Sequence, residues 1–474
     1  MEWFLGGLTL LLGFYMAWNI GANDVANAMG TSVGSKALTL RKAVYLAAIL
    51  EFAGAFLVGS NVSETIQKGI IDPTVFSADP MLFVLGMMGS LLATGILLQI
   101  ASYLALPIST THAIVGAVIG FGLVIGGVDA VCWTGVGSIV ASWIISPLLS
   151  GIISYFLFGL IQKKILYALN PIEATQKLLP ILVFSCFFTI FISLLHGGIP
   201  QLHISFSGLS SVSLSASLAL VAYFFSYKFV QTIASPKLEP ASGFHPDQAV
   251  SLEKALKHLQ RAHLSNHNES YQEQFTNAFN HIRSLTETVK KNTQFPRCHT
   301  QYQSVEKLFV FLQILSACLI AFAHGANDVA NAIGPVAAVI NVLKTRSLSS
   351  YAPVPSWLLI LGGSGIVIGL ATWGWRVIET IGKKITELTP TRGFSAEFGA
   401  AITILLASKL GLPISSTHAL VGAVLGVGLN RGLQALNLQM LREIVISWIV
   451  TIPLCALLSI LAFYSLKYLW IFIS

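Results

Sequence analysis

Two copies of one polar motif place acidic and amide side chains inside apolar sequence. Residues 21–28 read GANDVANA, and residues 325–332 read the same eight letters, 304 positions later. A charged side chain costs about 2.5 to 3.5 kcal/mol at the centre of a membrane helix, so an acid in such a segment indicates a functional site. Carboxylate and amide oxygens are hard ligands that suit a hard cation such as Na⁺. The residues that we expect to contact a cation are Asn23, Asp24, Asn27, Asn327, Asp328 and Asn331.

A second pair of motifs places hydroxyl groups directly after a proline. Residues 106–112 read LPISTTH and residues 412–418 read LPISSTH, at an offset of 306. Pro with Ser or Thr beside it is typical of a helix N-terminus, where free backbone N–H groups and the positive end of the helix dipole bind anions. Two such helix ends at one place favour a compact, multiply charged oxyanion. The residues expected at this anion site are Ser109, Thr110, Thr111, Ser415, Ser416 and Thr417, together with the carboxylates of Asp24 and Asp328.

Each motif also has a purely structural interpretation. Buried Asn and Asp can serve only to hold neighbouring helices together, and hydroxyls after a proline can serve only to satisfy the backbone of a kinked helix. His112 and His418, which close the second motif, are expected to be structural hydrogen-bond partners. Glu397 aligns with Leu91 at the 306 offset, so it has no acidic counterpart. It is a candidate ligand for a cation bound in one half only, or else it faces water or the interface.

Membrane helices must position these motifs, because the composition excludes an ordinary soluble protein. Of the 474 residues, 54% are apolar and 10% are charged, whereas soluble proteins carry roughly a quarter charged residues. Twelve apolar runs reach or approach the ~20 residues that a membrane helix needs. The sequence therefore predicts an all-α polytopic membrane protein. The expected spans are 3–28, 43–60, 81–106, 113–128, 136–161, 178–196, 212–233, 308–340, 356–378, 394–411, 419–429 and 443–465.

The two GANDVANA copies occupy the first and the eighth spans, so seven crossings separate them. An odd number gives the copies opposite orientation, which is the inverted-topology repeat of many secondary transporters. The fourth and eleventh runs are short and follow a proline, so we expect broken or re-entrant helices there. The expected parts are repeat 1 at 1–161, connecting transmembrane helices at 162–233, a polar loop at 234–307 and repeat 2 at 308–474.

The basic residues predict how the chain is oriented in the membrane. The odd-numbered connections contain twelve Lys and Arg residues and the even-numbered ones contain four, so the odd ones are expected to be cytoplasmic. The loop 234–307, which holds 16 of the 47 charged residues, is then cytoplasmic and both termini lie outside. No basic leader precedes the first apolar run, from which we expect a multi-pass protein of a plasma or inner membrane.

The paired motifs resemble the signatures of the inorganic phosphate transporter (PiT) family. The resemblance covers residues 3 to about 160 and 308 to about 465 and leaves out the loop. The segments that carry it are GANDVANA at 21–28, HGANDVANA at 324–332, LPISTTH at 106–112, LPISSTH at 412–418 and RGFSAE at 392–397.

This resemblance implies symport of phosphate with Na⁺ or H⁺. It places Asp24 and Asp328, with the neighbouring asparagines, near the cations, and the Ser/Thr runs near phosphate. Ile20 precedes the first signature where His324 precedes the second, so the two halves need not contribute equally. The partners that follow are phosphate, the coupling cation and the lipid bilayer, without nucleic acid, cofactor or a metal other than Na⁺. The sequence leaves open whether the protein forms a homodimer.

Two alternative functions remain open from the residues alone. A permease of the same fold for sulfate or for a metal phosphate is the first, although sulfate cannot donate a hydrogen bond to an Asp as protonated phosphate can. An intramembrane hydrolase that uses Ser109, His112 and Asp24 is the second. The serine lacks the G-x-S-x-G surroundings of a nucleophile elbow, and catalysis needs no inverted copy. A transporter, and not an enzyme, is therefore expected.

The orientation is tested by an epitope tag fused after Ser474. Because the even connections carry few basic residues, we expect an antibody to reach the tag on intact cells, without permeabilisation. A tag that is reached only after permeabilisation would contradict the predicted topology.

Overall fold

The computed structural model describes most of the chain outside the polar loop. Leu106, Pro107, Glu379, Ser474 and most of the loop 234–307 lie outside the described residues. The described residues are 2–104, 108–196, 204, 206–232, 252, 255–256, 259–260, 272–292, 295–348, 354–375, 378, 389–431 and 438–473.

The chain divides into two compact units, and both signature copies lie in unit 1. Unit 1 comprises Met1–Gly159, Pro180–Phe225 and Phe309–Ser474, and unit 2 comprises Leu160–Leu179 and Ser226–Leu308. Within unit 2, the Tyr302 hydroxyl donates a hydrogen bond to the Leu166 carbonyl at 2.7 Å. The four-part division predicted from the sequence stays a prediction.

Regular structure in the described residues is helical, apart from isolated bridge residues, of which Ile71 and Val131 pair with each other. Helices α6, α7, α8 and α11 extend across the boundary between the two units. The main helices are α1 (Glu2–Gly34), α2 (Leu40–Val58), α3 (Ser60–Lys68), α4 (Pro80–Tyr103), α5 (Thr110–Phe121), α6 (Trp133–Ile161), α7 (Pro171–Leu195), α8 (Gly208–Gln231), α10 (Gln272–Asn292), α11 (Phe295–Thr345), α12 (Ser356–Gly369), α14 (Pro390–Lys409), α15 (Ser416–Arg431) and α16 (Leu438–Ile473). Short 3₁₀ or π segments are η1 (Pro73–Phe76), η2 (Gly122–Gly126), η3 (Val128–Ala130), η4 (Gln162–Leu166) and η7 (Leu370–Gly374).

The predicted fold class is confirmed, but the number of crossings is not. Among the described residues, eight helices are long and apolar enough to span a membrane, or nine if α2 and α3, which meet at a 62° bend, count as one span. The runs predicted at 113–128, 394–411 and 419–429 correspond to α5, α14 and α15, which are not among these eight. The count of twelve spans therefore stays a prediction, since α14 and the two short helices α5 and α15 fall outside these eight.

Helix α5 folds back along α4. The Phe76 ring lies 5.9 Å from the Phe83 ring near the start of α4 and 6.0 Å from the Phe121 ring at the end of α5. A Cβ atom on Gly86 of α4 would lie 2.2 Å from the same Phe121 ring. The end of α5 thus returns to the side on which α4 begins. The pair α4–α5 therefore brings the chain back to the side on which α4 begins, as the predicted orientation of the repeats requires.

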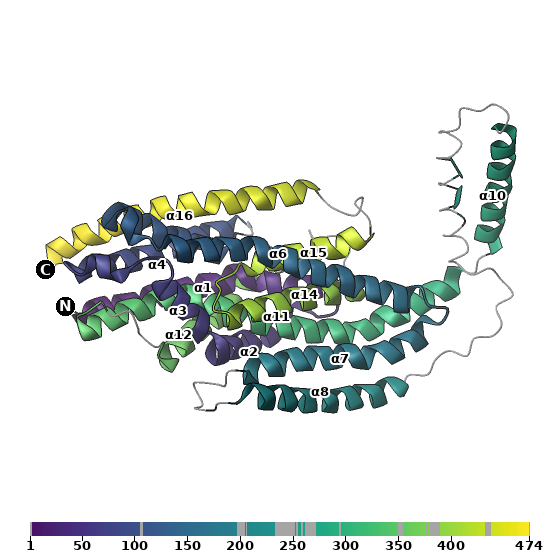
Figure 1. The fold of residues 1–474 in the computed structure, drawn as a ribbon, viewed down its shortest axis with the longest axis horizontal. Helices are drawn as coiled ribbons and strands as arrows, with labels where there is room; N and C mark the ends of the chain where they lie inside the picture. The colour runs from purple at the N-terminus through teal and green to yellow at the C-terminus, as the bar shows by residue number, and fades with distance from the viewer. Residues whose placement is uncertain are drawn as a thin grey trace. The chain divides into compact units, whose positions relative to one another are not determined.

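The signature helices α1 and α11 run antiparallel. Arg346 Nε, just after α11, lies 3.0 Å from Glu2 Oε1 at the start of α1. Further along, Gly13 of α1 faces Val336 of α11. Figure 1 places the N- and C-terminal ends of the chain together at one end of the long helices. The antiparallel pair is the arrangement that an inverted repeat requires.

Reciprocal packing relates the two halves through four glycines. Gly21 of α1 lies on the backbone of α12, where an added Cβ would be 1.9 Å from the Ile366 carbonyl oxygen. Its counterpart Gly325 of α11 lies on α2 in the same way, 2.0 Å from the Glu51 carbonyl oxygen. The exchange of partners, with α1 on α12 and α11 on α2, is what a two-fold axis between the repeats produces. The same relation holds for Gly54, whose Cβ would be 2.0 Å from the Phe322 carbonyl oxygen, and for Gly369, at 1.9 Å from that of Trp18.

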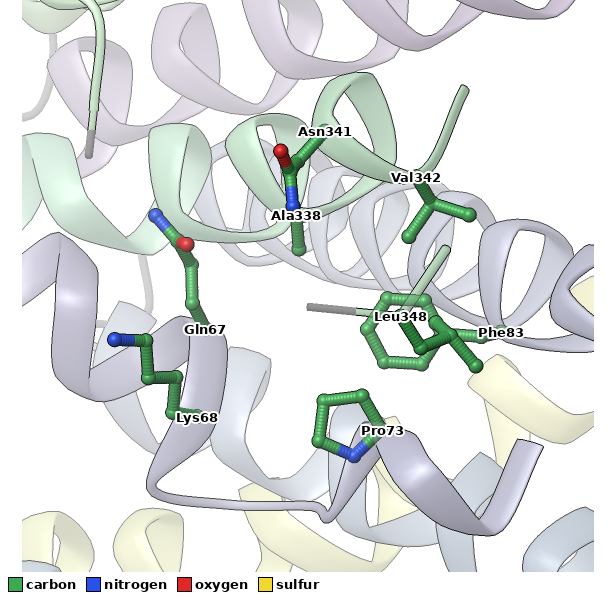
Figure 2. A pocket seen from close by; sticks show the side chains of 8 residues that line it. All are labelled: Gln67, Lys68, Pro73, Phe83, Ala338, Asn341, Val342 and Leu348. Atoms are coloured by element: carbon green, nitrogen blue, oxygen red, sulfur yellow. The ribbon is translucent and has the colours of Figure 1, made fainter. Parts of the chain in front are cut away.

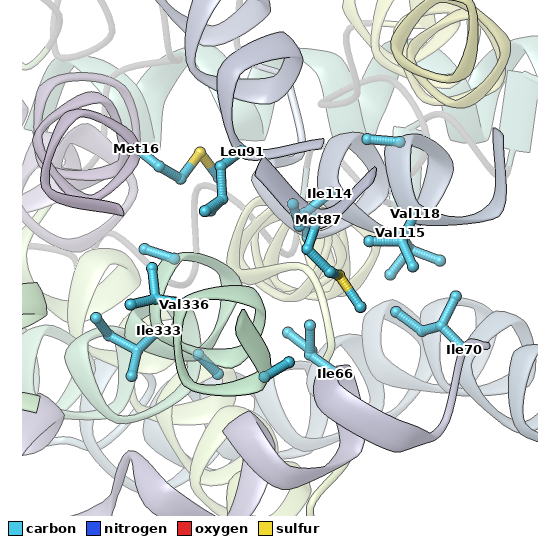
Figure 3. Packing of buried hydrophobic residues seen from close by; sticks show 14 of the residues in the cluster. Met16, Ile66, Ile70, Met87, Leu91, Ile114, Val115, Val118, Ile333 and Val336 are labelled. Atoms are coloured by element: carbon cyan, nitrogen blue, oxygen red, sulfur yellow. The ribbon is translucent and has the colours of Figure 1, made fainter. Parts of the chain in front are cut away.

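Both repeats contribute to one hydrophobic core. Figure 3 shows Met16 of α1 and Leu91 of α4 beside Ile333 and Val336 of α11. Side chains of α5, among them Ile114, complete the cluster. The core therefore holds the signature helices and α5 in fixed relative positions.

Substitution of Gly369 by Ala tests the close approach of α12 to α1. The new methyl group would overlap the Trp18 carbonyl oxygen, and backbone cannot move as a flexible side chain can, so we expect the free energy of unfolding to fall by about 2 kcal/mol or more. The measurement is thermal unfolding in detergent, followed by size-exclusion chromatography.

Gly137→Ala is the matched control, because a Cβ on Gly137 in α6 would meet nothing within 4 Å. We expect it to leave stability unchanged or to raise it by up to about 1 kcal/mol through helix propensity. Equal melting temperatures for the Gly369 and Gly137 variants would contradict the close approach.

Candidate functional site

The six predicted residues of the GANDVANA copies are all buried inside unit 1. Asn23, Asp24 and Asn27 on α1 are exposed by 3%, 1% and 6%, and the three counterparts on α11 by no more than 1%. Residues i and i+4 of a helix share a face. The two asparagines of each copy therefore project in the same direction, as the spacing indicated.

The two Ser/Thr runs begin helices, as predicted. The hydroxyl of Ser109 accepts a hydrogen bond from the backbone N–H of His112 at 3.2 Å, and α5 starts at the next residue. The hydroxyl of Ser415 accepts one from His418 N–H, also at 3.2 Å, and α15 starts directly after it. These serines are N-caps, which satisfy one of the N–H groups that a helix leaves free at its start.

The N-termini of the two short helices meet. The Thr111 hydroxyl, in the first turn of α5, donates a hydrogen bond to the Ile414 carbonyl, just before α15, at 2.9 Å. The rings of His112 and His418 lie 4.4 Å apart, centre to centre, in an edge-on contact. Trp143 Nε1 of α6 donates to the Pro413 carbonyl at 3.0 Å. The two histidines lie at the contact between the repeats, and their role as hydrogen-bond partners stays a prediction.

Asparagines of each signature reach the hydroxyl run of the other repeat. Asn27 Nδ2 donates to the Thr417 hydroxyl at 2.7 Å. Asn331, its counterpart, donates to the hydroxyls of Thr111 at 3.2 Å and Thr110 at 3.3 Å. The four motifs, dispersed over some 400 positions of sequence, are therefore one cluster that belongs equally to both halves.

Each signature carboxylate lies beside the first residue of the short helix in its own repeat. Asp24 accepts a hydrogen bond from Asn23 Nδ2 at 3.0 Å and interacts with the Thr110 hydroxyl. Asp328 Oδ2 accepts one from the Ser416 hydroxyl at 2.8 Å. Carboxylates close to helix N-termini are stabilised by the helix dipole.

Several acceptor oxygens of this cluster are buried without a hydrogen-bond donor among the described residues. They belong to both carboxylates and to two amides, and an unpaired buried acceptor costs about 1 to 3 kcal/mol. Oxygens of this kind, at a site with two negative charges, fit a hard monovalent cation. The atoms are Asp24 Oδ2, Asn327 Oδ1, Asp328 Oδ1 and Asn331 Oδ1.

Two residues outside the predicted site are linked to Asp328, His324 directly and Glu51 through His324. His324 Nδ1 lies 3.1 Å from Glu51 Oε1 of α2, and its Nε2 lies 2.9 Å from Asp328 Oδ2. One ligand atom each from Asp24, His324 and Asp328 lie within 4.8 Å of one another. The sequence signalled both residues, because Glu51 is an acid in an apolar run and His324 is a difference between the two signatures. Sequence reasoning assigned a site to neither.

Glu397 lies in a separate polar cluster between α14, α1 and α11. Its carboxylate is fully buried and accepts hydrogen bonds from Thr31 at 2.5 Å, Ser32 at 2.7 Å and Ser316 at 2.5 Å. Gln313 Nε2 is 3.4 Å away. The interpretation of Glu397 as a water-facing acid is therefore wrong. Its partners were missed, since nothing in their spacing connects them to residue 397.

Two serines that sequence reasoning also missed contact the signature asparagines. The Ser102 hydroxyl donates to Asn23 Oδ1 at 3.3 Å, and Asn327 Nδ2 donates to the Ser408 hydroxyl at 3.1 Å. The two serines recur at the 306 offset, so an alignment of the whole repeats contained this signal.

A small pocket in unit 1 lies apart from these residues. Figure 2 shows it between Gln67 and Lys68 of α3, Phe83 of α4 and Asn341 of α11. It encloses about 20 Å³ of open space, little more than one water molecule requires. It does not include any residue of the twin motifs.

Comparison with known proteins agrees with this geometry. The sequence pattern of the phosphate transporter family matches residues 20–459, from before the first signature to within α16. The chain belongs to the phosphate transporter family. This transporter is 46% identical over 466 residues, 98% of its length and 71% of the other chain, to the inorganic phosphate transporter 2-1, chloroplastic, of Arabidopsis thaliana.

A solved structure shares the fold of this transporter. It is described as the sodium-dependent phosphate transporter, with a TM-score of 0.80 and 36% sequence identity, and the match covers 98% of this chain and 99% of that one. The apolar helices and the family together identify an integral membrane protein. The family consists of transporters, in agreement with the expectation that the protein is not an enzyme.

The N-cap of α5 is tested by Ser109→Ala. Loss of the capping hydroxyl leaves the His112 N–H unpaired, so we expect the free energy of unfolding to fall by about 1 kcal/mol. The measurement is thermal unfolding in detergent. Ser138→Ala serves as control, because that exposed hydroxyl only donates to the Gly135 carbonyl of its own helix, and equal losses in the two variants would contradict the capping role.

Proposed function

We propose that this protein imports inorganic phosphate by symport with Na⁺, at one site formed jointly by the two repeats. One observation carries the proposal: two buried carboxylates lie where the N-termini of two short helices meet, one helix from each repeat. Such a place offers a negative and a positive electrostatic feature side by side. It suits an anion and a cation that bind together.

The helix ends supply the anion half of the site. The first four N–H groups of a helix have no acceptor within it, and the aligned peptide dipoles add about half a positive charge there. Around these ends lie the buried hydroxyls of Thr110, Thr111, Ser416 and Thr417. Hydroxyls can donate to phosphate oxygens or accept from a protonated one, so the site needs neither Lys nor Arg to bind phosphate.

The carboxylates and amides supply the cation half and couple it to the anion. Two unit charges 4 Å apart interact by about 4 kcal/mol at an effective dielectric constant of 20, so Asp24 and Asp328 would repel a phosphate anion bound next to them. A cation on their free oxygens offsets this repulsion. Phosphate therefore binds well only to the cation-loaded site, which is the differential stabilisation that symport requires.

Na⁺ is the cation favoured by the ligands and by the relative. The unpaired oxygens of two carboxylates and two amides form a ligand set for a hard metal cation, whereas a proton needs one acceptor. The structural neighbour is described as sodium-dependent. The cluster around Glu397, with three hydroxyl oxygens close to one carboxylate, is proposed as a further cation site that belongs to one half only.

The inverted repeats supply the alternating access. Two half-sites related by a two-fold axis can exchange their inward and outward states with little change in energy. The reciprocal contacts of Gly21 with Ile366 and of Gly325 with Glu51 support this axis. With the basic connections inside, the termini and the start of α4 face outward, and the sodium gradient across a plasma or inner membrane drives uptake.

The transport proposal is tested in proteoliposomes with radiolabelled phosphate. Under an inward Na⁺ gradient we expect concentrative uptake, and little uptake under a pH gradient alone. Asp24→Asn and Asp328→Asn should each lower uptake at least about tenfold, because loss of one charged ligand costs about 1.5 to 3 kcal/mol. Glu397→Gln should raise the half-saturating Na⁺ concentration.

Unlabelled sulfate at equal concentration is the specificity control, and Ser138→Ala is the control variant. Sulfate should compete weakly, because it cannot donate a hydrogen bond to a carboxylate. Uptake driven by the pH gradient alone would replace Na⁺ by H⁺. Competition by sulfate as strong as by phosphate would overturn the substrate.

A further inference from the structure

One place in the core breaks the two-fold symmetry with buried charge. Glu51 of α2, His324 of α11 and Asp328 of α11 form a chain of contacts at 3.1 Å and 2.9 Å, and none of them is exposed by more than 1%. Neither Glu51 nor His324 contributes to the symport mechanism above. The cost of burying these groups therefore calls for a purpose.

The other half has an apolar pair at the matching place. Gly325 follows His324 and lies on the Glu51 backbone, whereas Gly21 follows Ile20 and lies on the Ile366 backbone. Ile20 and Ile366 are both fully buried. Two buried isoleucines thus occupy in one half the positions that an imidazole and an acid occupy in the other. The fold itself does not need the charged pair.

The charged pair reaches only one of the two carboxylates at close range. Asp328 Oδ2 lies 2.9 Å from His324 Nε2 and accepts from Ser416 at 2.8 Å, which leaves Oδ1 as its unpaired oxygen. Asp24 has no such anchor, because the residue four positions before it is Ile20, where the other signature has His324. Glu51 holds the far side of the imidazole ring, so it fixes the ring and, through it, Asp328. Acids that orient a histidine in this way are common behind metal ligands.

We propose that Glu51 and His324 are positioning residues that fix Asp328 as the rigid cation ligand and leave Asp24 as the adaptable one. The two carboxylates then differ in rigidity as cation ligands, although the two signatures have the same sequence. The proposal rests on Na⁺-coupled symport as stated above. It differs from that mechanism in assigning a role to two residues that the mechanism does not use.

The test exchanges the charged pair for the apolar pair that the protein already uses. The double variant Glu51→Ile with His324→Ile copies Ile366 and Ile20, so it should fold, whereas His324→Ile alone leaves a buried acid without its partner. His324→Gln is the conservative variant, since its amide can still donate to Asp328. Ile366→Val, at the matching apolar place, is the control. Thermal unfolding is measured for all of them.

The readout separates positioning from folding. In proteoliposomes, the half-saturating Na⁺ concentration is measured at saturating phosphate, and the phosphate KM at saturating Na⁺. For the double variant we expect the half-saturating Na⁺ concentration to rise about tenfold, as the loss of one hydrogen bond to a charged ligand implies, with a phosphate KM changed less than about twofold. His324→Gln should stay within about threefold of the wild type, and Ile366→Val should not differ from it.

The other outcomes bear either on the positioning role or on the proposed function. A folded double variant with unchanged Na⁺ dependence, or with equal changes in both parameters, overturns the positioning role. If the double variant does not fold, Glu51→Gln decides: an unchanged Na⁺ dependence overturns the proposal, and a rise supports it. Absence of Na⁺-driven uptake in the wild type overturns the proposed function itself, which distinguishes that failure from failure of this inference.

Discussion

The burial of two carboxylates next to two helix N-termini is the interaction on which the rest of this structure depends. Inside a membrane protein, water does not pair with backbone N–H groups or screen an acid. Asp24 lies beside Thr110, and Asp328 lies beside Ser416, so each acid faces the positive end of a helix. The carboxylate and the free N–H groups of the helix therefore partly stabilise each other. The short helices α5 and α15 can begin inside the protein only because these carboxylates and the capping serines lie at their N-termini.

The close approach of helix backbones serves this arrangement. Gly21 and Gly325 stand two residues before the first asparagine of each signature, and a Cβ added to either would lie about 2 Å from a backbone oxygen of the facing helix. Any larger residue would push α1 from α12 or α11 from α2 and would move the carboxylates with them. The glycines of the signature are therefore explained by packing, and its Asn and Asp residues by the site.

Symmetry and its exceptions have different roles. The reciprocal contacts of Asn27 with Thr417 and of Asn331 with Thr111 join the halves into one cluster, as alternating access from both sides requires. The exceptions are Glu397 and the Glu51–His324 pair. Their counterparts in the other repeat are apolar residues. The proposed symport benefits from such local differences, because a phosphate anion and a cation need different surroundings.

The sequence by itself determined the class of the protein, the inverted repeat and most of the candidate site. An apolar composition indicates a membrane protein, and a duplicated motif indicates a duplicated structure, so the class and the repeat follow from the sequence. Tertiary structure decided that α5 folds back along α4, because the packing of Phe121 against Phe76 and Gly86 is not written in the apolar pattern. It also decided the partners of Glu397 and the link from Glu51 through His324 to Asp328. These contacts join residues far apart in the chain, and no local periodicity or spacing encodes which distant side chains will meet.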